Sequence, residues 1–372
     1  MGVMADDAAP DPAPRDPAAD LRRIAYLLER SSAATQRVRA FRTAAGIVAR
    51  LDPAELAARV AARTLTELPG IGKSTSAVIE QSAAGERPKY LADLESDPAA
   101  TAVRADSVER LDPAAADLLR ALRGDLHSHS DWSDGGSPIE EMAGAARDLG
   151  REYLALTDHS PRLTVANGLS VERLAQQLDV LERIRPTLGD FRLLSGIEVD
   201  ILDDGALDQT DAMLARLDVV VASVHSKLRM DSEAMTARMI GAIANEHTDV
   251  LGHCTGRMVA GNRQRPESSF DAELVFAACA QFGVAVEINS RFERLDPPMR
   301  LLEQAVEAGC LFSIDTDAHA PGQLEWLRNG AERAARAGVP IERIVTAWPV
   351  EDLLAWTADH YHRPAAASIR RG

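Results

Sequence analysis

The sequence has few of the residues that stabilise secreted or membrane-embedded proteins. Only three cysteines occur among 372 residues, which excludes a disulfide framework. No run of about 18 apolar residues is present, so no membrane-spanning helix is expected. The first twenty residues lack the apolar segment of a secretory signal. Lysine is equally scarce, with only Lys73, Lys89 and Lys227. The lysine scarcity reflects genome composition, whereas the lack of a membrane span and of a secretory signal favours a cytoplasmic protein.

The charge of the chain is unevenly distributed. The formal net charge is −16, which argues against a protein that simply coats polyanions. Residues 22–89, however, hold 12 Lys and Arg against 6 Asp and Glu, whereas residues 125–372 hold 24 against 39. The pattern indicates a small basic module attached to a large acidic one. If the acidic module handles phosphates, it needs bound cations to offset its charge.

Hydrophobic spacing predicts a helical region over residues 20–83. Leu21, Ile24 and Leu28 recur at helical intervals, and Asp20 is placed to act as the N-cap of the first helix. Composition then suggests five parts: a disordered acidic tail over 1–19, a small all-α domain over 20–92, a connector over 93–122 with one or two short helices, an α/β domain over 123–361, and a tail over 362–372.

Seven short β-branched runs alternate with predicted helical stretches after residue 122. The strand sequences are DLHSH, YLALT, LLSGIEVDI, DVVVASVH, DVLGH, VAVEINS and LFSIDT. Strands that alternate with helices in this way are typical of parallel sheets. The predicted fold is therefore a parallel, barrel-like α/β domain.

Histidines and carboxylates gather at the ends of these strands. In a parallel barrel the C-terminal ends of the strands meet at one mouth, so the side chains are expected to meet there. Any one such histidine is more often structural, but six of nine at strand ends is not a chance pattern. Imidazole and carboxylate suit Zn²⁺, Mn²⁺ or Fe²⁺, and nine ligands suggest two to three divalent ions. The nine are His127, His129, Asp134, His159, Glu198, His225, His253, Asp317 and His319.

The motifs HSHSDWSDG, LTDHS, GIEVDI, SVHS, GHCTGR, EINS and DTDAH, in this order, resemble the PHP (polymerase and histidinol phosphatase) family. The resemblance is greatest to the PHP domain of bacterial X-family DNA polymerases. It implies a distorted (β/α)7 barrel with a trinuclear site. By motif position, one ion would be held by His127, His129, Glu198 and Asp317; Glu198 would bridge to a second ion, held also by His225 and His253; and Asp134, His159 and His319 would hold the third. Cys254 stands where such polymerases usually have proline.

Such a centre is suited to phosphoester hydrolysis. Paired ions can activate a water, and our hypothesis is that a metal hydroxide attacks phosphorus. Glu198 would be catalytic as the bridging ligand, and Asp317 either as ligand or in proton transfer. Phosphate would be bound by the cations that follow strand ends, which are Lys227, Arg257 and Arg294. Asp158 and Asp315 stand beside ligands, where they could orient histidines.

The segment LPGIGKS in the basic module resembles the turn of a helix-hairpin-helix motif, and residues 20–92 resemble the small N-terminal domain of X-family polymerases. Glycines allow close approach of the backbone, and a helix N-terminus offers N–H groups to a phosphate. The residues expected to contact DNA are Gly70, Ile71, Gly72 and Lys73. A nucleotide-binding P-loop is excluded, because Glu67 stands where that motif needs glycine. Val78 stands where the polymerase family often has a lyase lysine.

The polymerase catalytic domains themselves are missing, since only 54 residues separate Gly72 from His127. Three functions remain open. The first is a DNA-end phosphoesterase, either a 3′–5′ exonuclease or a 3′-phosphatase. The second is a small-molecule phosphatase of the histidinol-phosphatase type. The third is a non-catalytic DNA-binding adaptor, which the complete set of nine residues disfavours.

Overall fold

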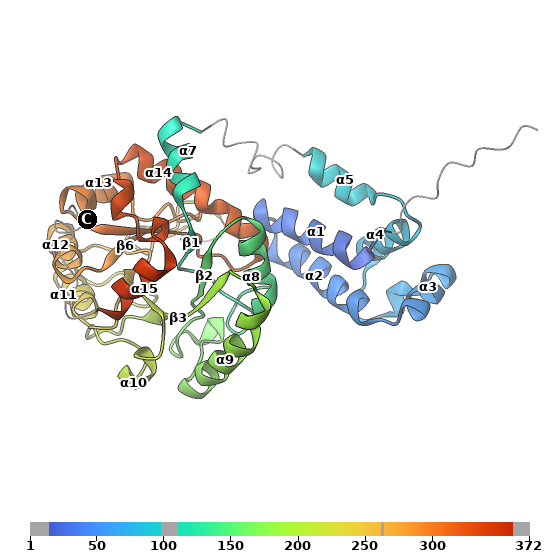
Figure 1. Cartoon of the computed structure of the whole chain (residues 1–372), viewed down its shortest axis with the longest axis horizontal. Helices are drawn as coiled ribbons and strands as arrows, with labels where there is room; N and C mark the ends of the chain where they lie inside the picture. The colour runs from blue at the N-terminus through green and yellow to red at the C-terminus, as the bar shows by residue number, and fades with distance from the viewer. Residues whose placement is uncertain (1–14, 98–110, 262–263, 360–372) are drawn as a thin grey trace, which may run out of the picture. The chain divides into compact units, whose positions relative to one another are not determined.

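The computed structural model describes residues 15–97, 111–261 and 264–359 (Figure 1). The chain divides into two compact units, residues 1–103 and 104–372. Residues 1–14 of the expected N-terminal tail, 98–110 of the connector and the whole expected C-terminal tail lie outside the described residues. Among the residues that the structure describes, no helix is both long and apolar enough to cross a membrane. All three cysteines are buried and unpaired.

The first unit is all-helical, as predicted. Its first helix nevertheless begins earlier than expected, because Asp16 is the N-cap: its carboxylate accepts a hydrogen bond from Ala18 N at 2.8 Å, and Pro17 occupies the first helical position. Asp20, expected as the cap, is instead buried and accepts from Ser82 Oγ at 2.7 Å, which ties α1 to α4. The elements are α1 (Pro17–Arg30), α2 (Thr35–Arg50), α3 (Pro53–Ala62), the 3₁₀ turn η1 (Leu65–Glu67), α4 (Lys73–Ala83) and α5 (Lys89–Ser96).

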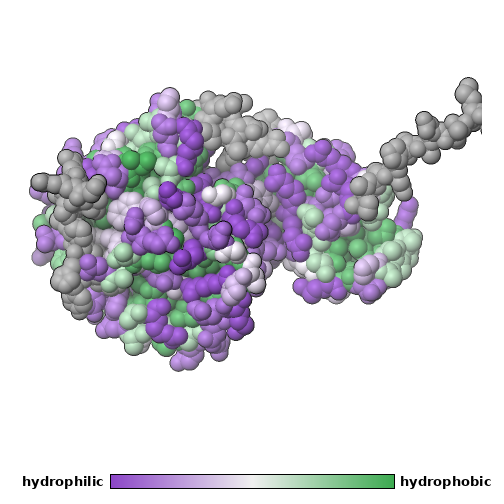
Figure 2. Space-filling view, in the orientation of Figure 1, coloured by the Kyte–Doolittle hydropathy of each residue, from purple (hydrophilic) through white to green (hydrophobic). Residues whose placement is uncertain are grey.

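The core of the helical unit forms from the apolar stripes of α1, α2 and α4. Leu21, Ile24 and Leu28 on α1 are fully buried and share one cluster with Phe41 and Ile79. By contrast, α3 buries none of its side chains, and the surface of the unit at that helix is partly hydrophobic in Figure 2. The unit is thus a small bundle with its own core, sufficient to hold the hairpin between η1 and α4 in place.

The second unit is a barrel of seven parallel strands in the order β1 to β7, which confirms the predicted fold. A parallel bridge between Ser128 and Ala318 joins the chain beyond β1 to the chain beyond β7 and nearly closes the barrel. The strands are β1 (Gly124–Asp125), β2 (Tyr153–Leu156), β3 (Arg192–Asp200), β4 (Val219–Ser223), β5 (Val250–Leu251), β6 (Ala285–Asn289) and β7 (Leu311–Asp315).

Helices surround the barrel (Figure 1). They are α7 (Pro113–Ala121), α8 (Ile139–Asp148), α9 (Val171–Ile184), α10 (Asp211–Leu214), α11 (Ser232–Ile243), α12 (Ala272–Phe282), α13 (Met299–Glu307), α14 (Leu327–Arg336) and α15 (Val350–Ala358), with 3₁₀ turns η3 (Thr164–Ala166), η4 (Arg185–Thr187), η5 (Pro321–Trp326), η6 (Ile341–Arg343) and η7 (Val345–Ala347).

The interior of the barrel changes character along the strands. Residues near the strand starts, such as Val219, Ala285 and Leu311, pack in an apolar cluster with Leu353 and Trp356 of α15. Because successive side chains of a strand alternate between its two faces, residues two and four positions further on also face inward. Those later inward positions are polar in β6 and β7. The apolar layer therefore fills one end of the barrel and leaves the C-terminal ends of the strands to a polar site.

Candidate metal centre

The nine predicted side chains meet at the C-terminal ends of the strands. Glu198 lies within β3, on the inward face, and is buried. The histidines come from the segments that follow the strands: two after β1, one each after β2, β4 and β5, and one after β7. Asp134 comes from the loop after β1, and Asp317 lies two residues beyond β7 with a positive φ of 52°. This backbone conformation is rare for a residue other than glycine and is typical of functional sites.

Glu198 is the centre of the cluster. Its Oε1 lies 2.8 Å from Nε2 of His253 and 3.1 Å from Nε2 of His225. Its Oε2 lies 2.8 Å from Nδ1 of His159, 3.3 Å from Nε2 of His127 and 3.6 Å from Nε2 of His129. The two carboxylate oxygens therefore face two different sets of imidazoles, which is the arrangement that a bridging ligand needs.

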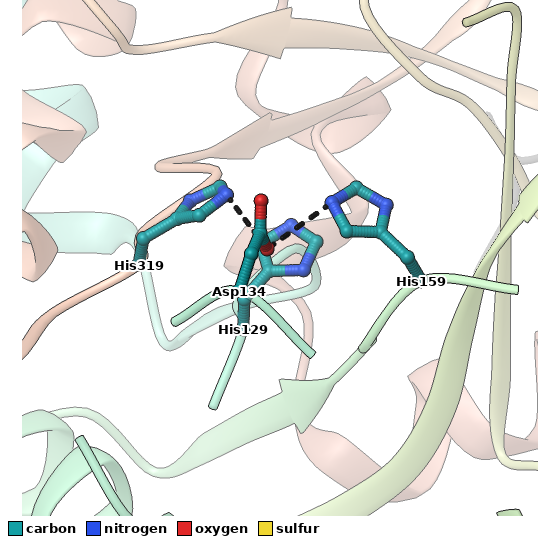
Figure 3. A group of neighbouring side chains, drawn as sticks. All are labelled: His129, Asp134, His159 and His319. Atoms are coloured by element: carbon teal, nitrogen blue, oxygen red, sulfur yellow. Dashed lines mark ion pairs between the residues drawn. The ribbon is translucent and has the colours of Figure 1, made fainter. Parts of the chain in front are cut away.

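Two further carboxylates complete the cluster. Oδ1 of Asp134 lies 3.4 Å from Nε2 of both His159 and His319 (Figure 3). Oδ1 of Asp317 lies 3.4 Å from Nε2 of His129 and 3.5 Å from Nδ1 of His319. Four ligand atoms around a tetrahedral zinc ion, at about 2.0–2.1 Å from it, stand about 3.3–3.4 Å apart. The spacing around Asp134 and Asp317 is therefore that of ligands around ions.

The buried polar atoms of the cluster fit metal ions. Buried polar groups in proteins nearly always have hydrogen-bond partners. Here both oxygens of Glu198 and Nε2 of His127, His129, His225 and His253 are buried without a hydrogen-bond partner among the described residues. Three groups have ligand atoms close enough to share an ion: His129, Asp134, His159 and His319; His127, His129 and Glu198; and His159, Glu198 and His225.

Burial and neighbouring charges both shift the pKa values of side chains in the cluster. Burial acts to raise the pKa of Glu198, but the imidazoles of His225 and His127 outweigh it and hold that pKa well below its ordinary value. Burial acts to lower the pKa of His159, but the carboxylate of Glu198 outweighs it and raises the pKa to about 10. Burial together with neighbouring imidazoles holds the pKa of His129 well below its ordinary value. Cations bound here would displace the protons of the charged imidazoles.

Two carboxylates orient histidines of the cluster, and sequence reasoning assigned a role to neither. Oε1 of Glu287 lies 2.6 Å from Nδ1 of His127, and its other oxygen accepts a hydrogen bond from the backbone N–H of His253. Asp200 accepts from the backbone N–H of His225 at 3.0 Å, and the same oxygen lies 3.4 Å from Nδ1 of that ring. Carboxylates in this position fix the ring orientation of metal-binding histidines.

The expectation that Asp158 and Asp315 orient histidines is wrong. Asp158 instead accepts hydrogen bonds from Ser130 N at 2.9 Å and from Gln177 Nε2 at 2.6 Å, so it fixes the loop that follows His129. Asp315 accepts from Leu126 N at 2.7 Å, which ties the ends of β1 and β7 together. Both residues hold the backbone that carries ligands, and among the described residues neither bonds to an imidazole.

The three cations expected to bind phosphate lie in different places. Arg294 reaches the cluster: its Nε donates to Asp317 at 3.1 Å, and its Nη1 is buried without a partner among the described residues. Arg257 instead donates from Nε to the carbonyl oxygen of Arg294 at 3.0 Å, so it anchors the loop. Lys227 is exposed and pairs with Asp203. Among the described residues, neither Arg257 nor Lys227 contacts a member of the cluster.

Arg291 was missed by the sequence analysis. Its Nη1 lies 3.4 Å from Oδ1 of Asp317 and 3.2 Å from Nδ1 of His319. Two guanidinium groups therefore flank Asp317, one from Arg291 and one from Arg294. Burial acts to raise the pKa of Asp317, but these guanidiniums outweigh it and keep the carboxylate ionised.

In the helical unit, the predicted hairpin lies between η1 and α4. Gly70 has a φ of 95°, and a Cβ at this position would lie 2.8 Å from Thr43 Cγ2, so glycine is required there. The side chain of Ile71 is buried in the core and its N–H donates to Leu68 O at 3.0 Å, so Ile71 anchors the turn rather than offering a contact. Gly72 is the N-cap of α4 and has no side chain to cap the helix, while Lys73 is exposed.

A parallel barrel with a histidine and carboxylate cluster at the C-terminal ends of its strands defines a metal-binding α/β-barrel protein. Residues 125–291 match the PHP domain, and residues 13–87 match a helix-hairpin-helix domain. The chain belongs to the PHP family of metal-dependent phosphoesterases, as the sequence motifs indicated.

Three relatives illustrate the range of the family. The DNA polymerase/3'-5' exonuclease PolX of Bacillus subtilis (strain 168) is 36% identical over 251 residues, covering 68% of this chain and 42% of the relative. A probable phosphatase of Shewanella halifaxensis (strain HAW-EB4) is 30% identical over 248 residues, covering 64% of this chain and 93% of the relative. A probable phosphatase of Thermoanaerobacter sp. (strain X514) is 30% identical, covering 52% and 78%. The chain thus spans less than half of the length of PolX.

Proposed function

We propose that this protein is a metal-dependent phosphoester hydrolase that acts on DNA ends, as a 3′–5′ exonuclease or a 3′-phosphatase. The observation that carries the proposal is the buried cluster around Glu198, whose two oxygens face separate sets of imidazoles. The donor set suits two or three divalent ions of the Mn²⁺, Zn²⁺ or Fe²⁺ type. Such ions, when bound, supply an activated water and neutralise charge that develops on phosphoryl oxygens.

The protein's own residues position the phosphate. Nη1 of Arg294 and Nε of Arg291 are buried without hydrogen-bond partners among the described residues, and both side chains lie beside Asp317. Guanidinium donors of this kind bind phosphate oxygens strongly. The carboxylate of Glu287 contacts Nδ1 of His127 and holds that ring in place. The arginines would thus hold the phosphoester at the cluster while the histidines and carboxylates hold the ions.

The helical unit supports DNA as the substrate. The first turn of an α-helix leaves backbone N–H groups without intrahelical partners, and such groups bind phosphate. At the N-terminus of α4 the N–H of Gly72 donates to Thr75 Oγ1 at 2.9 Å, so the N–H groups that follow it in the first turn are those that a phosphate could use, beside the exposed ammonium of Lys73. Exposed arginines on α2, at positions Arg37 and Arg39, add positive charge to the same unit. The net positive charge of residues 22–89 favours contact with a polyanion.

A second function is a small-molecule phosphatase of the histidinol-phosphatase type. The strongly acidic barrel unit favours it, because excess negative charge repels a DNA strand. Relatives that share most of their own length with this chain are also described as probable phosphatases. The third possibility, a non-catalytic DNA-binding adaptor, does not explain why all nine ligands are present and close together.

The lysines of the helical unit offer a matched test of the two catalytic functions. Lys73 is exposed at the hairpin, whereas Lys89 is exposed on α5, where it pairs with Asp93. Protein loaded with Mn²⁺ would be assayed on 3′-labelled single-stranded DNA, on DNA with a 3′-phosphate and on histidinol phosphate. We expect Lys73→Glu to weaken DNA binding, to make its log–log salt dependence shallower by about one unit and to slow hydrolysis of DNA ends.

Lys89→Glu is the control, with the same change of charge away from the hairpin, and it should behave as the wild type on every substrate. Histidinol phosphate hydrolysis should be unchanged in both variants, because that substrate needs only the metal centre. If Lys73→Glu and Lys89→Glu degrade DNA ends equally well, and histidinol phosphate is hydrolysed far faster than DNA, the small-molecule phosphatase replaces the DNA-end enzyme.

A further inference from the structure

Six large hydrophobic side chains are exposed among the described residues, and two of them are aromatic, Phe282 and Phe292. Phe282 ends α12 just before β6 and so lies at the end of the barrel remote from the cluster. Phe292 comes three residues after β6 and so lies at the end that carries the cluster. The two are similarly exposed, at 44% and 38%.

Phe292 lies in a turn whose two ends are fastened to the metal centre. Arg294 N donates to Arg291 O at 3.1 Å, which closes the turn around Phe292. The side chains of both arginines reach Asp317. The carbonyl oxygen of Glu293 accepts a hydrogen bond from Val259 N at 2.7 Å, so the turn is also held from the loop after β5.

The ring of Phe292 is fixed as well as exposed. It packs against the buried Trp326 with the ring centroids 5.3 Å apart and the planes at 77°. A fixed aromatic ring loses little conformational entropy when a ligand stacks on it. An ordinary flexible surface phenylalanine would not have this advantage.

This turn borders the open side of the cluster. The side chains of Asp134 and His319 are 37% and 20% exposed, whereas Glu198 and His127 are almost completely buried. Nη1 of Arg291 lies 3.2 Å from Nδ1 of His319, so the turn adjoins the exposed ligands. The turn that holds Phe292 is therefore next to the ligands that solvent reaches.

We infer that Phe292 is a stacking platform for the base of the terminal nucleotide whose phosphate is bound at the metal centre. The inference rests on the proposed phosphoesterase function and names its substrate class as a nucleotide with its base in place. The donors of Arg291 and Arg294 fit the phosphate, and the exposed ring fits the planar base. Stacking on an aromatic side chain tolerates every base, because each has a π face.

Binding of two oligonucleotides to the full chain tests this inference. Both are single-stranded and carry a phosphorothioate at the last linkage to slow hydrolysis. One ends in a thymidine nucleotide, and the other has the same backbone with an abasic last residue. We expect the wild type to bind the thymidine end at least about fivefold more tightly, the lower range of base–aromatic stacking. Phe292→Ala should reduce the difference to less than about twofold, whereas Phe292→Tyr should keep it.

Phe282→Ala is the matched control, since it removes a similarly exposed ring at the other end of the barrel. It should bind both oligonucleotides as the wild type does. Hydrolysis of glycerol phosphate, which has no ring, should change less than about twofold in Phe292→Ala. If Phe292→Ala weakens binding of both oligonucleotides equally and also slows hydrolysis of glycerol phosphate, Phe292 has a purely structural role and the inference is overturned.

The binding experiment, together with an assay of phosphoester hydrolysis by the wild type, separates this inference from the proposed function. If the wild type hydrolyses DNA ends but binds the thymidine and abasic ends equally, the platform is wrong and the phosphoesterase stands. If the wild type prefers the thymidine end, loses that preference in Phe292→Ala and hydrolyses no phosphoester, the platform stands and the phosphoesterase is wrong.

Discussion

Replacing Glu198 with glutamine perturbs two groups of ligands at once. Oε1 faces His225 and His253, and Oε2 faces His127 and His159. The amide keeps the shape of the side chain, but its NH₂ group cannot ligate a cation and its charge is lost. Whichever way the amide is oriented, one of the two groups loses its oxygen ligand.

The expected loss of activity in Glu198→Gln can be estimated from substitutions that affect one metal ligand only. Removing a residue that only orients a metal ligand typically costs 10–100-fold in metal affinity or activity. Glu198 contacts both groups directly, so we expect kcat/KM to fall by about 10²–10⁴-fold, the product of such losses at two sites. The fold should survive, because apolar residues of the strands and helices supply the packing.

Hydrolysis of a phosphoester in the presence of Mn²⁺ would be measured for Glu198→Gln alongside circular dichroism of the same samples. Glu267→Gln, which changes a surface carboxylate paired with Arg300, is the control and should retain normal activity. A folded Glu198→Gln protein with hydrolysis within about threefold of the wild type would refute the bridging role.

Three other outcomes follow from the structure. Glu287→Gln should lower metal affinity by about 10–100-fold, since the carboxylate holds the ring of His127; titration of the metal-free protein with Zn²⁺ would show this. Arg294→Ala should raise KM for phosphoesters more than tenfold because a charge-assisted donor beside Asp317 is lost, and steady-state kinetics would reveal an unchanged KM if the assignment is wrong. Burial raises the pKa of Cys310 to about 12 and protects the other two thiols, so a thiol reagent at pH 8 should label none until denaturant is added.

The metal-ligand types and their convergence could be predicted because two rules act together. Parallel strands bring their C-terminal ends to one place, and a histidine just beyond a strand has little freedom to be elsewhere. His225 and His253 each follow a short β-branched run, so their positions were set once the strands were recognised. The assignment of individual ligands to individual ions remains a prediction.

Long side chains were harder to place. Lys227 and Arg257 also follow strand ends, yet one turns to Asp203 and the other to the carbonyl oxygen of Arg294. Four or more rotatable bonds let such a side chain reach any acceptor nearby, and sequence does not show which acceptor is free. Arg291 was missed for the same reason, because its role depends on the turn that it begins.

The sequence does contain a signal for Glu287, one of the carboxylates that orient histidines. Glu287 lies two residues after Ala285 on β6, so the alternation of the strand points both into the barrel. A carboxylate inside an apolar strand needs a buried partner, and the histidine cluster is the obvious source. At the N-terminus, Asp16 followed by Pro17 was a stronger cap signal than Asp20, because proline favours the first helical position.

Val78 limits what the helical unit can do. It stands where the resemblance to X-family polymerases implies a lyase lysine, and here it is buried in the core cluster with Ile79 and Leu91. A lysine there would be charged and buried without a partner, at a cost of several kcal/mol. Val78 is therefore a packing residue of the helical unit.

The most direct test of the central claim is the metal content of the folded protein. The claim is that residues from six strand ends form one centre for several ions, with Glu198 shared between them. Protein reconstituted with Mn²⁺ or Zn²⁺ and freed of loosely held metal would be examined by elemental analysis. The account predicts two to three ions per chain. One ion or none in the fully folded wild type would contradict it.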